Sequence, residues 1–285
     1  MSESQQYNTI ILITGANTGI GLATVQALLT SPTSETRNTI ILTSRSLDRA
    51  NKAVEELKAD STYSQAFSSG NQVIPKQLDL NDEESAKSLH DDIKKSYGRV
   101  DVLINNAGAH YDFPIAAGKM TRREGFIKAF YTNVVATDAF TELFMDLLFE
   151  AESQTQNGAR LIYLSSGISS LTDHSNQNVP VNQSPAAGWP KRKPVFQVPT
   201  YRTSKTAMNM MILEWVRTLK NDNIKIHIID PGFNATNLGG GDIDLLRSKG
   251  AQEPIKAGLF IKSVIQGERD NDQGKLIGKD GVIPW

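Results

Sequence analysis

The amino-acid sequence predicts an α/β protein with a doubly wound, seven-stranded parallel sheet and helices on both faces, in three layers. Short runs rich in Ile, Val and Leu alternate with longer amphipathic stretches, as in successive βαβ units. A candidate strand near the N-terminus is followed by a glycine-rich turn and then by a helical pattern. Right-handed crossovers place the carboxyl ends of such strands along one edge, where we expect ligands to bind.

The predicted elements alternate along the chain. Strands are expected at Thr9–Ile13, Thr39–Thr43, Val73–Leu78, Val100–Ile104, Arg160–Leu164, Ile224–Ile229 and Lys275–Ile277. Helices are expected at Ile20–Leu29, Leu47–Ala59, Glu83–Tyr97, Arg122–Glu150 and Tyr201–Asn221. Residues 1–285 are expected to form one domain, since 285 residues lie close to the size at which a single core stops growing.

Two segments interrupt the alternation. Residues 169–199 carry five prolines with many Asn, Gln and Ser, which predicts an irregular insertion before the last helix. This insertion is either a flap on the substrate side or a surface loop without function. Residues 238–258 include three consecutive glycines and are predicted to be a substrate-side loop with a short helix.

Composition excludes several classes of partner. The chain has 30 Lys and Arg against 31 Asp and Glu, so no net field draws it to nucleic acid or to an anionic membrane. It has 0 Cys, which excludes disulfides, thiolate nucleophiles and Cys-based zinc sites. Neither a basic or apolar leader nor an apolar run of roughly 18 residues is present. We expect a cytoplasmic protein whose partner is a small molecule.

The sequence TGANTGIG, residues 14–21, joins the first strand to the first helix. Such a turn presents backbone N–H groups and a positive helix end to a pyrophosphate, and its glycines permit close approach. The alternative is a tight turn without a ligand. The candidate cofactor-binding residues here are Gly15, Asn17, Thr18, Gly19, Ile20 and Gly21.

The end of the second strand bears on the choice of nicotinamide cofactor. An acidic residue there selects NAD, whereas a basic one accommodates the 2′-phosphate of NADP. Here Ser44 and Arg45 end the strand, Arg49 lies one helical turn onward, and no carboxylate occurs before Asp48. This favours NADPH, although either arginine could be an ordinary solvated charge.

A catalytic constellation is predicted around Tyr201 and Lys205, which a spacing of four places on one helix face. An ammonium near a tyrosine in a desolvated cleft lowers the phenol pKa from about 10 and makes it a better proton shuttle. Ser165 and Ser166 end a buried strand, and either hydroxyl could bind a carbonyl oxygen. Asn133 interrupts a helix, either as a polar kink serving the site or as a buried, satisfied amide.

Taken together, the motifs TGANTGIG, LDLND, NNAG, Asn133, LSS, YRTSK and PGFNAT resemble the short-chain dehydrogenase/reductase family over Asn8–Leu276. ILTSRSLDRA, QLDLNDEES and YGRVDVLINNAGAHY look closest to its NADPH-dependent carbonyl reductases. The resemblance implies a Rossmann-type fold with Tyr201 as proton donor, Lys205 binding the nicotinamide ribose and Ser166 orienting the carbonyl. It also implies that Asn133 holds a water in the proton relay and that no metal is needed.

The same resemblance implies further cofactor contacts. Asp79 and Leu80 would lie at the adenine, Asn106 and Ala107 beside the adenosine ribose, and Pro231, Gly232, Phe233 and Thr236 around the nicotinamide. Gly108 is a further candidate cofactor-binding residue. The pro-S hydride of NADPH would reach the carbonyl carbon. Relatives that use NADPH often have Lys or Arg within the glycine turn, where this chain has Thr18, so NADPH is expected mainly because of Arg45.

The expected function is reduction of a bulky, apolar ketone, aldehyde or quinone. The expected pocket lining is aromatic and apolar: Tyr111, Phe113, Trp189, Phe196, Phe233 and Leu238. The alternatives are the reverse reaction, as an alcohol dehydrogenase in a biosynthetic route, and a non-catalytic NADP-binding sensor or scaffold. Relatives pair through their long helices, but the insertion is expected to cover that face, which favours a monomer.

Overall fold

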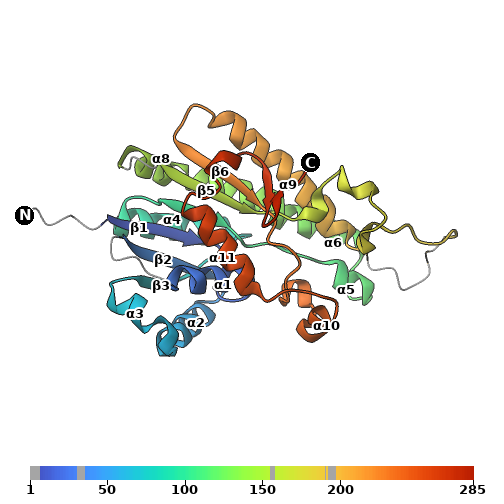
Figure 1. Cartoon of the computed structure of the whole chain (residues 1–285), viewed down its shortest axis with the longest axis horizontal. Coiled ribbons are helices and arrows are strands. Elements are labelled where there is room, and N and C mark those ends of the chain that lie inside the picture. Colours follow the sequence, from blue (N-terminus) through green and yellow to red (C-terminus); the bar gives the residue numbers. More distant parts are fainter. Residues whose placement is uncertain (1–6, 31–35, 155–157, 190, 192–196) are drawn as a thin grey trace, which may run out of the picture.

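The computed structural model describes residues 7–30, 36–154, 158–189, 191 and 197–285. Its strands form one sheet in the order β3-β2-β1-β4-β5-β6-β7-β8 (Figure 1). They are β1 (Tyr7–Ile13), β2 (Thr36–Ser44), β3 (Gln72–Gln77), β4 (Val102–Asn105), β5 (Ala159–Leu164), β6 (Ile224–Ile229), β7 (Leu276–Gly278) and β8 (Gly281–Val282).

The predicted seven-stranded parallel sheet is confirmed, with one correction. β8 is an additional strand that pairs antiparallel with β7, matching Ile277 to Val282 and Gly278 to Gly281. Two residues are too few to give an alternating sequence pattern, so the hairpin could not be read from the sequence. β1 pairs with both β2 and β4, so the strand order reverses there and opens a crevice at the carboxyl end of β1.

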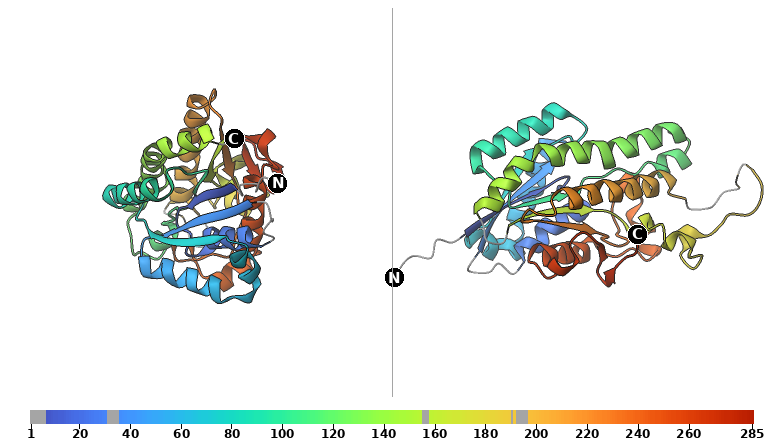
Figure 2. Two further views of the ribbon diagram at one scale, coloured as in Figure 1. Left: turned by 90° about the vertical axis from the view of Figure 1, so that its left-hand side faces the viewer. Right: turned by 90° about the horizontal axis from the view of Figure 1, so that it is seen from above.

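Helices cover both faces of the sheet (Figure 2). On one face, the core contains apolar side chains of α4 (Glu83–Tyr97), α7 (Thr137–Leu143), α8 (Met145–Gln154) and α9 (Pro199–Thr218). On the other face, it contains side chains of α1 (Gly19–Leu29), α2 (Leu47–Ala59) and α11 (Pro254–Ile265). The shorter helices are α3 (Ser64–Ser68), α5 (Asp112–Ala116), α6 (Arg122–Phe130) and α10 (Ile243–Ser248).

The single helix predicted over Arg122–Glu150 is wrong in detail, because two interruptions divide it. After α6 the chain makes a π-helical turn, Tyr131–Ala136, before α7, and Phe144 separates α7 from α8. The Thr137 hydroxyl donates to the Thr132 carbonyl at 3.0 Å, competing with the regular helix ladder. Wider turns of this kind occur frequently at functional sites, and Asn133 lies inside this one.

The loop predicted over residues 238–258 ends earlier than expected. Its short helix is α10, as predicted, but residues 254–258 already belong to α11, which the sequence pattern did not reveal. Gly258 explains how α11 approaches α1, since a Cβ there would lie 2.3 Å from the Ala23 carbonyl oxygen. The helix begins with Pro254 at its first turn, a favourable position for proline.

The insertion projects from the end of the molecule opposite the N-terminus (Figures 1 and 2). Its described part contains the one-turn 3₁₀ segments Asp173–Ser175 and Pro180–Asn182, and the Arg202 guanidinium donates to Asn182 Oδ1 at 2.6 Å. The expectation that it covers the long helices is not met by these residues. Apolar side chains on the π-helical turn, α6 and α9 stay exposed: Ile127, Tyr131, Val135 and Met210.

None of the helices in the described part of the chain is both long enough and apolar enough to span a bilayer.

Candidate active site

The glycine-rich turn is shaped for close approach of a ligand. Gly15 and Gly19 have φ of 63° and 58°, backbone conformations that favour glycine. Thr18 precedes α1 in an extended conformation, and its side chain makes no capping hydrogen bond. The first N–H groups of α1 therefore remain available to an anion, and no side chain blocks the turn at Gly15 or Gly19.

Asn106 fastens this turn to the neighbouring strand. Its side-chain amide donates to the carbonyls of Thr14 and Gly15 at 2.7 and 3.1 Å, and the Thr14 hydroxyl accepts from the N–H groups of Asn106 and Ala107. A Cβ on Gly21 would lie 2.6 Å from the Asn106 amide nitrogen, so Gly21 is needed for packing. The Asn106 side chain thus shapes the turn, while Ala107 contacts Gly15 directly.

The residues predicted to bind the adenosine part of the cofactor follow the ends of neighbouring strands. The Arg45 and Arg49 side chains are exposed, and the buried Ser44 hydroxyl accepts from the Ser46 N–H at 3.3 Å. Ser46 caps α2 by accepting from the Arg49 N–H at 3.4 Å. In the segment after β3, Asp79 accepts from the Asn81 N–H and is followed by the half-buried Leu80. Exposed guanidinium groups beside a helix N-terminus suit a phosphate.

Three of the four predicted catalytic side chains, those other than Asn133, meet near the carboxyl ends of β5 and β6. Tyr201 and Lys205 lie on the first turns of α9, with the Lys205 Nζ 5.8 Å from the centre of the Tyr201 ring. Ser166 follows β5 and hydrogen-bonds to the Tyr201 side chain. The Lys205 Nζ donates to the Leu164 carbonyl at 2.6 Å, and a Cβ on Gly108 would lie 3.6 Å from it.

The structure separates the roles of the two serines after β5. The buried Ser165 hydroxyl donates to Asn209 Oδ1 at 2.5 Å, and therefore ties the strand to α9. Ser166 is half-buried and stands next to Tyr201. Only the second hydroxyl is placed to meet a ligand at this edge.

Burial controls the protonation of both titratable groups. Burial raises the pKa of Tyr201 well above its usual value, the negative charge of Asp230 raises it further, and the hydrogen bond from Ser166 acts in the opposite direction. Burial lowers the pKa of Lys205 to about 8. We therefore expect Tyr201 to be a neutral phenol at physiological pH, and a lowering of its pKa by the Lys205 ammonium stays a prediction.

Asn133 is fully buried, with every amide hydrogen used by the protein. Its amide nitrogen donates to the Ala109 carbonyl and the Ser204 hydroxyl, each at 2.9 Å, and its oxygen accepts from the Ala109 N–H at 2.7 Å. It thereby joins the loop after β4 to α9 from within the π-helical turn. A role in holding a relay water stays a prediction.

The sequence analysis missed two buried residues beside Tyr201. Asp112 accepts hydrogen bonds from the Thr200 N–H, the Thr200 hydroxyl and the Tyr201 N–H at 3.0, 2.8 and 3.1 Å. The centres of the His110 and Tyr201 rings are 5.2 Å apart. The Nε2 atom of His110 lies 3.7 Å from an oxygen of the Asp112 carboxylate. Their loop follows NNAG, but no spacing rule links it to a helix almost ninety residues later.

The expected apolar pocket lining is only partly assembled. Phe233 lines a cavity beside Asp230, whereas Trp189 is 85% exposed and Leu238 is 39% exposed. Phe113 packs against His110 with 4.8 Å between ring centres, and Tyr111 is half-buried next to it. Phe196 lies outside the described residues. Thr236 lies beside the glycine turn, because a Cβ on Gly19 would lie 3.4 Å from its methyl group, and its contact with a cofactor stays a prediction.

Comparison with known proteins identifies the family. The short chain dehydrogenase family model matches residues 9–178. The short-chain dehydrogenase/reductase eupG of Phoma sp is 34% identical over 284 residues, covering 97% of each chain. Carbonyl reductase [NADPH] 1 of Bos taurus is 24% identical, covering 98% of this chain and 99% of its own. An NADPH-bound carbonyl reductase from chicken fatty liver shares the fold, with a TM-score of 0.70, 22% identity, and coverage of 97% and 98%. The chain therefore belongs to the short-chain dehydrogenase/reductase family, which includes carbonyl reductases.

Proposed function

We propose that this protein reduces a carbonyl compound to an alcohol with NADPH, using Tyr201 as the proton donor. The observation that carries the proposal is the convergence of Tyr201, Lys205 and Ser166 at the sheet edge that also holds the glycine turn. Family membership supports an oxidoreductase that uses a nicotinamide cofactor. Carbonyl reductases among its relatives support the substrate class.

The residues present fit a dinucleotide phosphate. Gly15 and Gly19 form a cradle that side chains would fill, and the uncapped N-terminus of α1 faces it. Arg45, with Arg49 behind it, would bind the 2′-phosphate, while Ala107 and Thr236 would border the cofactor from opposite walls. When bound, NADPH supplies the hydride that reduces the carbonyl carbon.

Each catalytic side chain has a separate task in that reaction. The Ser166 hydroxyl donates to the carbonyl oxygen and orients it toward the Tyr201 hydroxyl. Tyr201 gives its proton to this oxygen as negative charge develops there, so the C=O bond becomes C–OH with one hydride and one proton added. The Lys205 ammonium stabilises the phenolate that remains, held in place by the Leu164 carbonyl. Tyr201 then regains a proton from solvent.

The protonation states favour reduction over the reverse reaction. A proton donor must be neutral before the reaction, and burial of Tyr201 raises its pKa and keeps the phenol protonated. Oxidation of an alcohol would instead need the phenolate as a base. Transfer of that proton leaves a buried phenolate. Its energetic cost is offset by the Lys205 ammonium, by the Ser166 hydrogen bond, and by the greater basicity of the oxygen that is becoming an alkoxide.

The test is consumption of NADPH, followed by absorbance, with a panel of aromatic aldehydes, quinones and cyclic ketones. NADH is assayed in parallel, and Tyr201→Phe is the matched variant because it removes only the hydroxyl. NADPH consumption that Tyr201→Phe reduces at least about a hundredfold is expected from loss of the general acid. Tight NADPH binding without turnover of any carbonyl would instead indicate a sensor or scaffold.

A further inference from the structure

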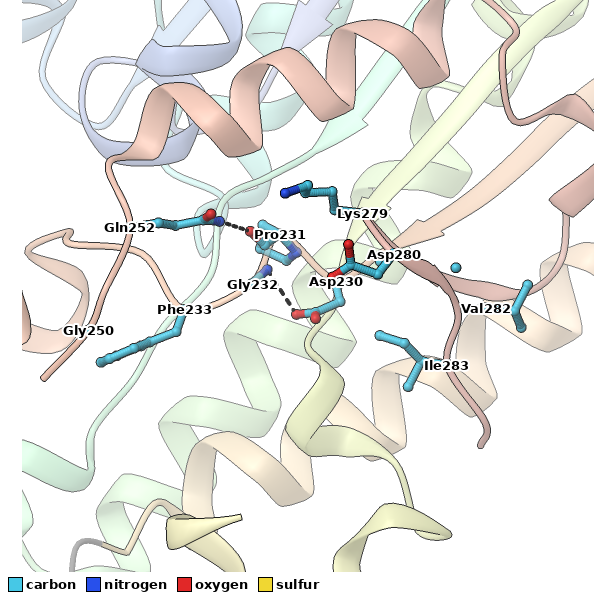
Figure 3. A pocket seen from close by; sticks show the side chains of 12 residues that line it. Asp230, Pro231, Gly232, Phe233, Gly250, Gln252, Lys279, Asp280, Val282 and Ile283 are labelled. Atoms are coloured by element: carbon cyan, nitrogen blue, oxygen red, sulfur yellow. Dashed lines mark hydrogen bonds between the residues drawn. The ribbon is translucent and has the colours of Figure 1, made fainter. Parts of the chain in front are cut away.

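A cavity of about 460 Å³ lies between the turn after β6 and the β7–β8 hairpin (Figure 3). One wall is the turn after β6, with Asp230, Gly232 and Phe233, and another is the β7–β8 hairpin, with Val282 and Ile283. The predicted cofactor contacts do not include this hairpin. The cavity therefore joins the turn predicted to contact the nicotinamide to a hairpin outside the predicted cofactor contacts, and the hairpin side is the part that a substrate would fill.

Asp230 connects this cavity to the reacting centre. Its Oδ2 lies 3.0 Å from the position that a Cβ would take on Gly167, the residue directly after Ser166. Ile283 approaches the same position to 3.6 Å, so the carboxylate and an apolar wall meet beside the catalytic serine. The charge of Asp230 also acts on the Tyr201 phenol.

The local backbone holds the carboxylate in one orientation. The Gly232 N–H donates to Asp230 Oδ1 at 3.2 Å, which fixes the side chain across the turn, as Figure 3 shows. Pro231 between them has no N–H to offer, and its carbonyl accepts from the Gln252 side chain at 3.0 Å. One oxygen is thus engaged by the turn, and Oδ2 faces the Gly167 side, next to Ser166.

We propose that Asp230 selects carbonyl substrates that carry a hydrogen-bond donor, a hydroxyl group, on an otherwise apolar skeleton. An ionised carboxylate only accepts hydrogen bonds, so it favours a substrate that donates one. Phe233, Val282 and Ile283 supply apolar surface for the skeleton. The inference rests on the proposed carbonyl reduction and names the class of compound that this site would prefer.

Matched substrates test this preference. The probes are meta-hydroxymethyl and meta-ethyl acetophenone, with the para pair alongside, because the members of each pair have nearly equal size and carbonyl reactivity. Wild-type enzyme is expected to favour the hydroxylated member at least about tenfold in kcat/KM, the size of a hydrogen bond to a charged group. Asp230→Asn should reduce that ratio about tenfold and Asp230→Ala should abolish it. The KM for NADPH should stay unchanged.

The control is Asp91→Asn, which removes the same charge from an exposed carboxylate on α4 and should keep the wild-type ratio. Equal loss for both members of a pair, or an increased KM for NADPH in Asp230→Asn, would overturn the proposal. If wild-type enzyme turns over none of the four compounds, the proposed reduction is not supported for this class. In that case, calorimetry measures the binding of the same pairs to the protein loaded with NADP⁺. Tighter binding of the hydroxylated member, lost in Asp230→Asn, would support the inference. Equal binding of the two members, or no binding, would overturn it.

Discussion

The backbone N–H of Tyr201 donates to the buried carboxylate of Asp112 at 3.1 Å, across 89 residues of sequence. The same carboxylate accepts from the N–H and hydroxyl of Thr200, so it holds the first turn of the helix that carries the proposed proton donor. Because a negative charge at a helix N-terminus is also favoured by the helix dipole, Asp112 both stabilises α9 and positions Tyr201.

Asp112→Ala is expected to lower kcat strongly while the KM for NADPH changes little. Loss of the carboxylate leaves buried donors unsatisfied, and we expect a decrease of about 2 kcal/mol in the free energy of unfolding. Steady-state kinetics and urea denaturation measure the two effects. Asp82→Ala, which removes the exposed cap of α4, is the control: it should lower stability by about 1 kcal/mol without changing kcat. A normal kcat in Asp112→Ala would contradict the positioning role.

The pH dependence of reduction should report Lys205. Burial lowers its pKa to about 8, so the ammonium that stabilises the phenolate loses its proton above that pH. We therefore expect kcat/KM for the carbonyl to decrease as the pH is raised from 7 to 10. Lys205→Arg should be slower but lack this decrease, because a guanidinium stays charged throughout. An identical alkaline decrease in both enzymes would assign it to another group.

Arg45→Ala should change the choice of cofactor. Removing a guanidinium that contacts the 2′-phosphate should raise the KM for NADPH about tenfold or more and leave the KM for NADH nearly unchanged. Arg49→Ala is the matched comparison, with a smaller effect expected because the residue lies one helical turn further along. Parallel changes for the two cofactors in Arg45→Ala would show that the side chain does not recognise the phosphate.

Acid stability should depend on His227, far from the proposed chemistry. Burial lowers its pKa to about 4, with a further contribution from the charge of Arg160. The unfolded chain therefore binds more protons than the folded one between pH 4 and 6.5, and stability falls as the pH is lowered through that range. From pH 7 to 5 the loss due to His227 is about 2 kcal/mol.

Urea denaturation of His227→Gln at the two pH values checks this, with the exposed His174→Gln as control. The His227 variant should lose less stability on acidification than wild type, and the His174 variant should match wild type.

Asp270 affects stability at a lower pH than His227 does. Burial alone raises its pKa, but Arg160 and Lys225 lower it to about 2, so its contribution is lost only as the pH falls toward that value.

Local patterns predicted most of the fold because each βαβ unit buries one apolar strand and one helix face. The runs around Ile11, Ile41 and Leu103 occupy fully buried positions in the sheet, as their composition requires. α11 was missed because its contact with α1 uses Gly258, and glycine indicates no helix by propensity. The breaks near Asn133 depend on partners in distant segments, Ala109 and Ser204, which no local pattern contains.

The candidate site divides in the same way. Tyr201 and Lys205 could be predicted because a spacing of four fixes their common helix face, and the glycine turn because it directly follows a strand. Asp112, His110 and Asp230 needed the tertiary structure, since the first two approach Tyr201 from the segment after β4 and Asp230 approaches it from the end of β6. A monomer was expected because of the insertion, whose described residues leave the α6 and α9 side chains exposed. Light scattering measures the oligomeric state, and a mass of 31.3 kDa would identify a monomer.

The most direct test of carbonyl reduction follows the hydride itself. NADPH carrying deuterium at the pro-S position of C4 is mixed with the enzyme and a carbonyl that it consumes, and the alcohol is analysed by mass spectrometry. The account predicts one deuterium on the carbinol carbon with wild-type enzyme, and almost no alcohol with Tyr201→Phe. Alcohol without deuterium, or undiminished alcohol from Tyr201→Phe, would contradict it.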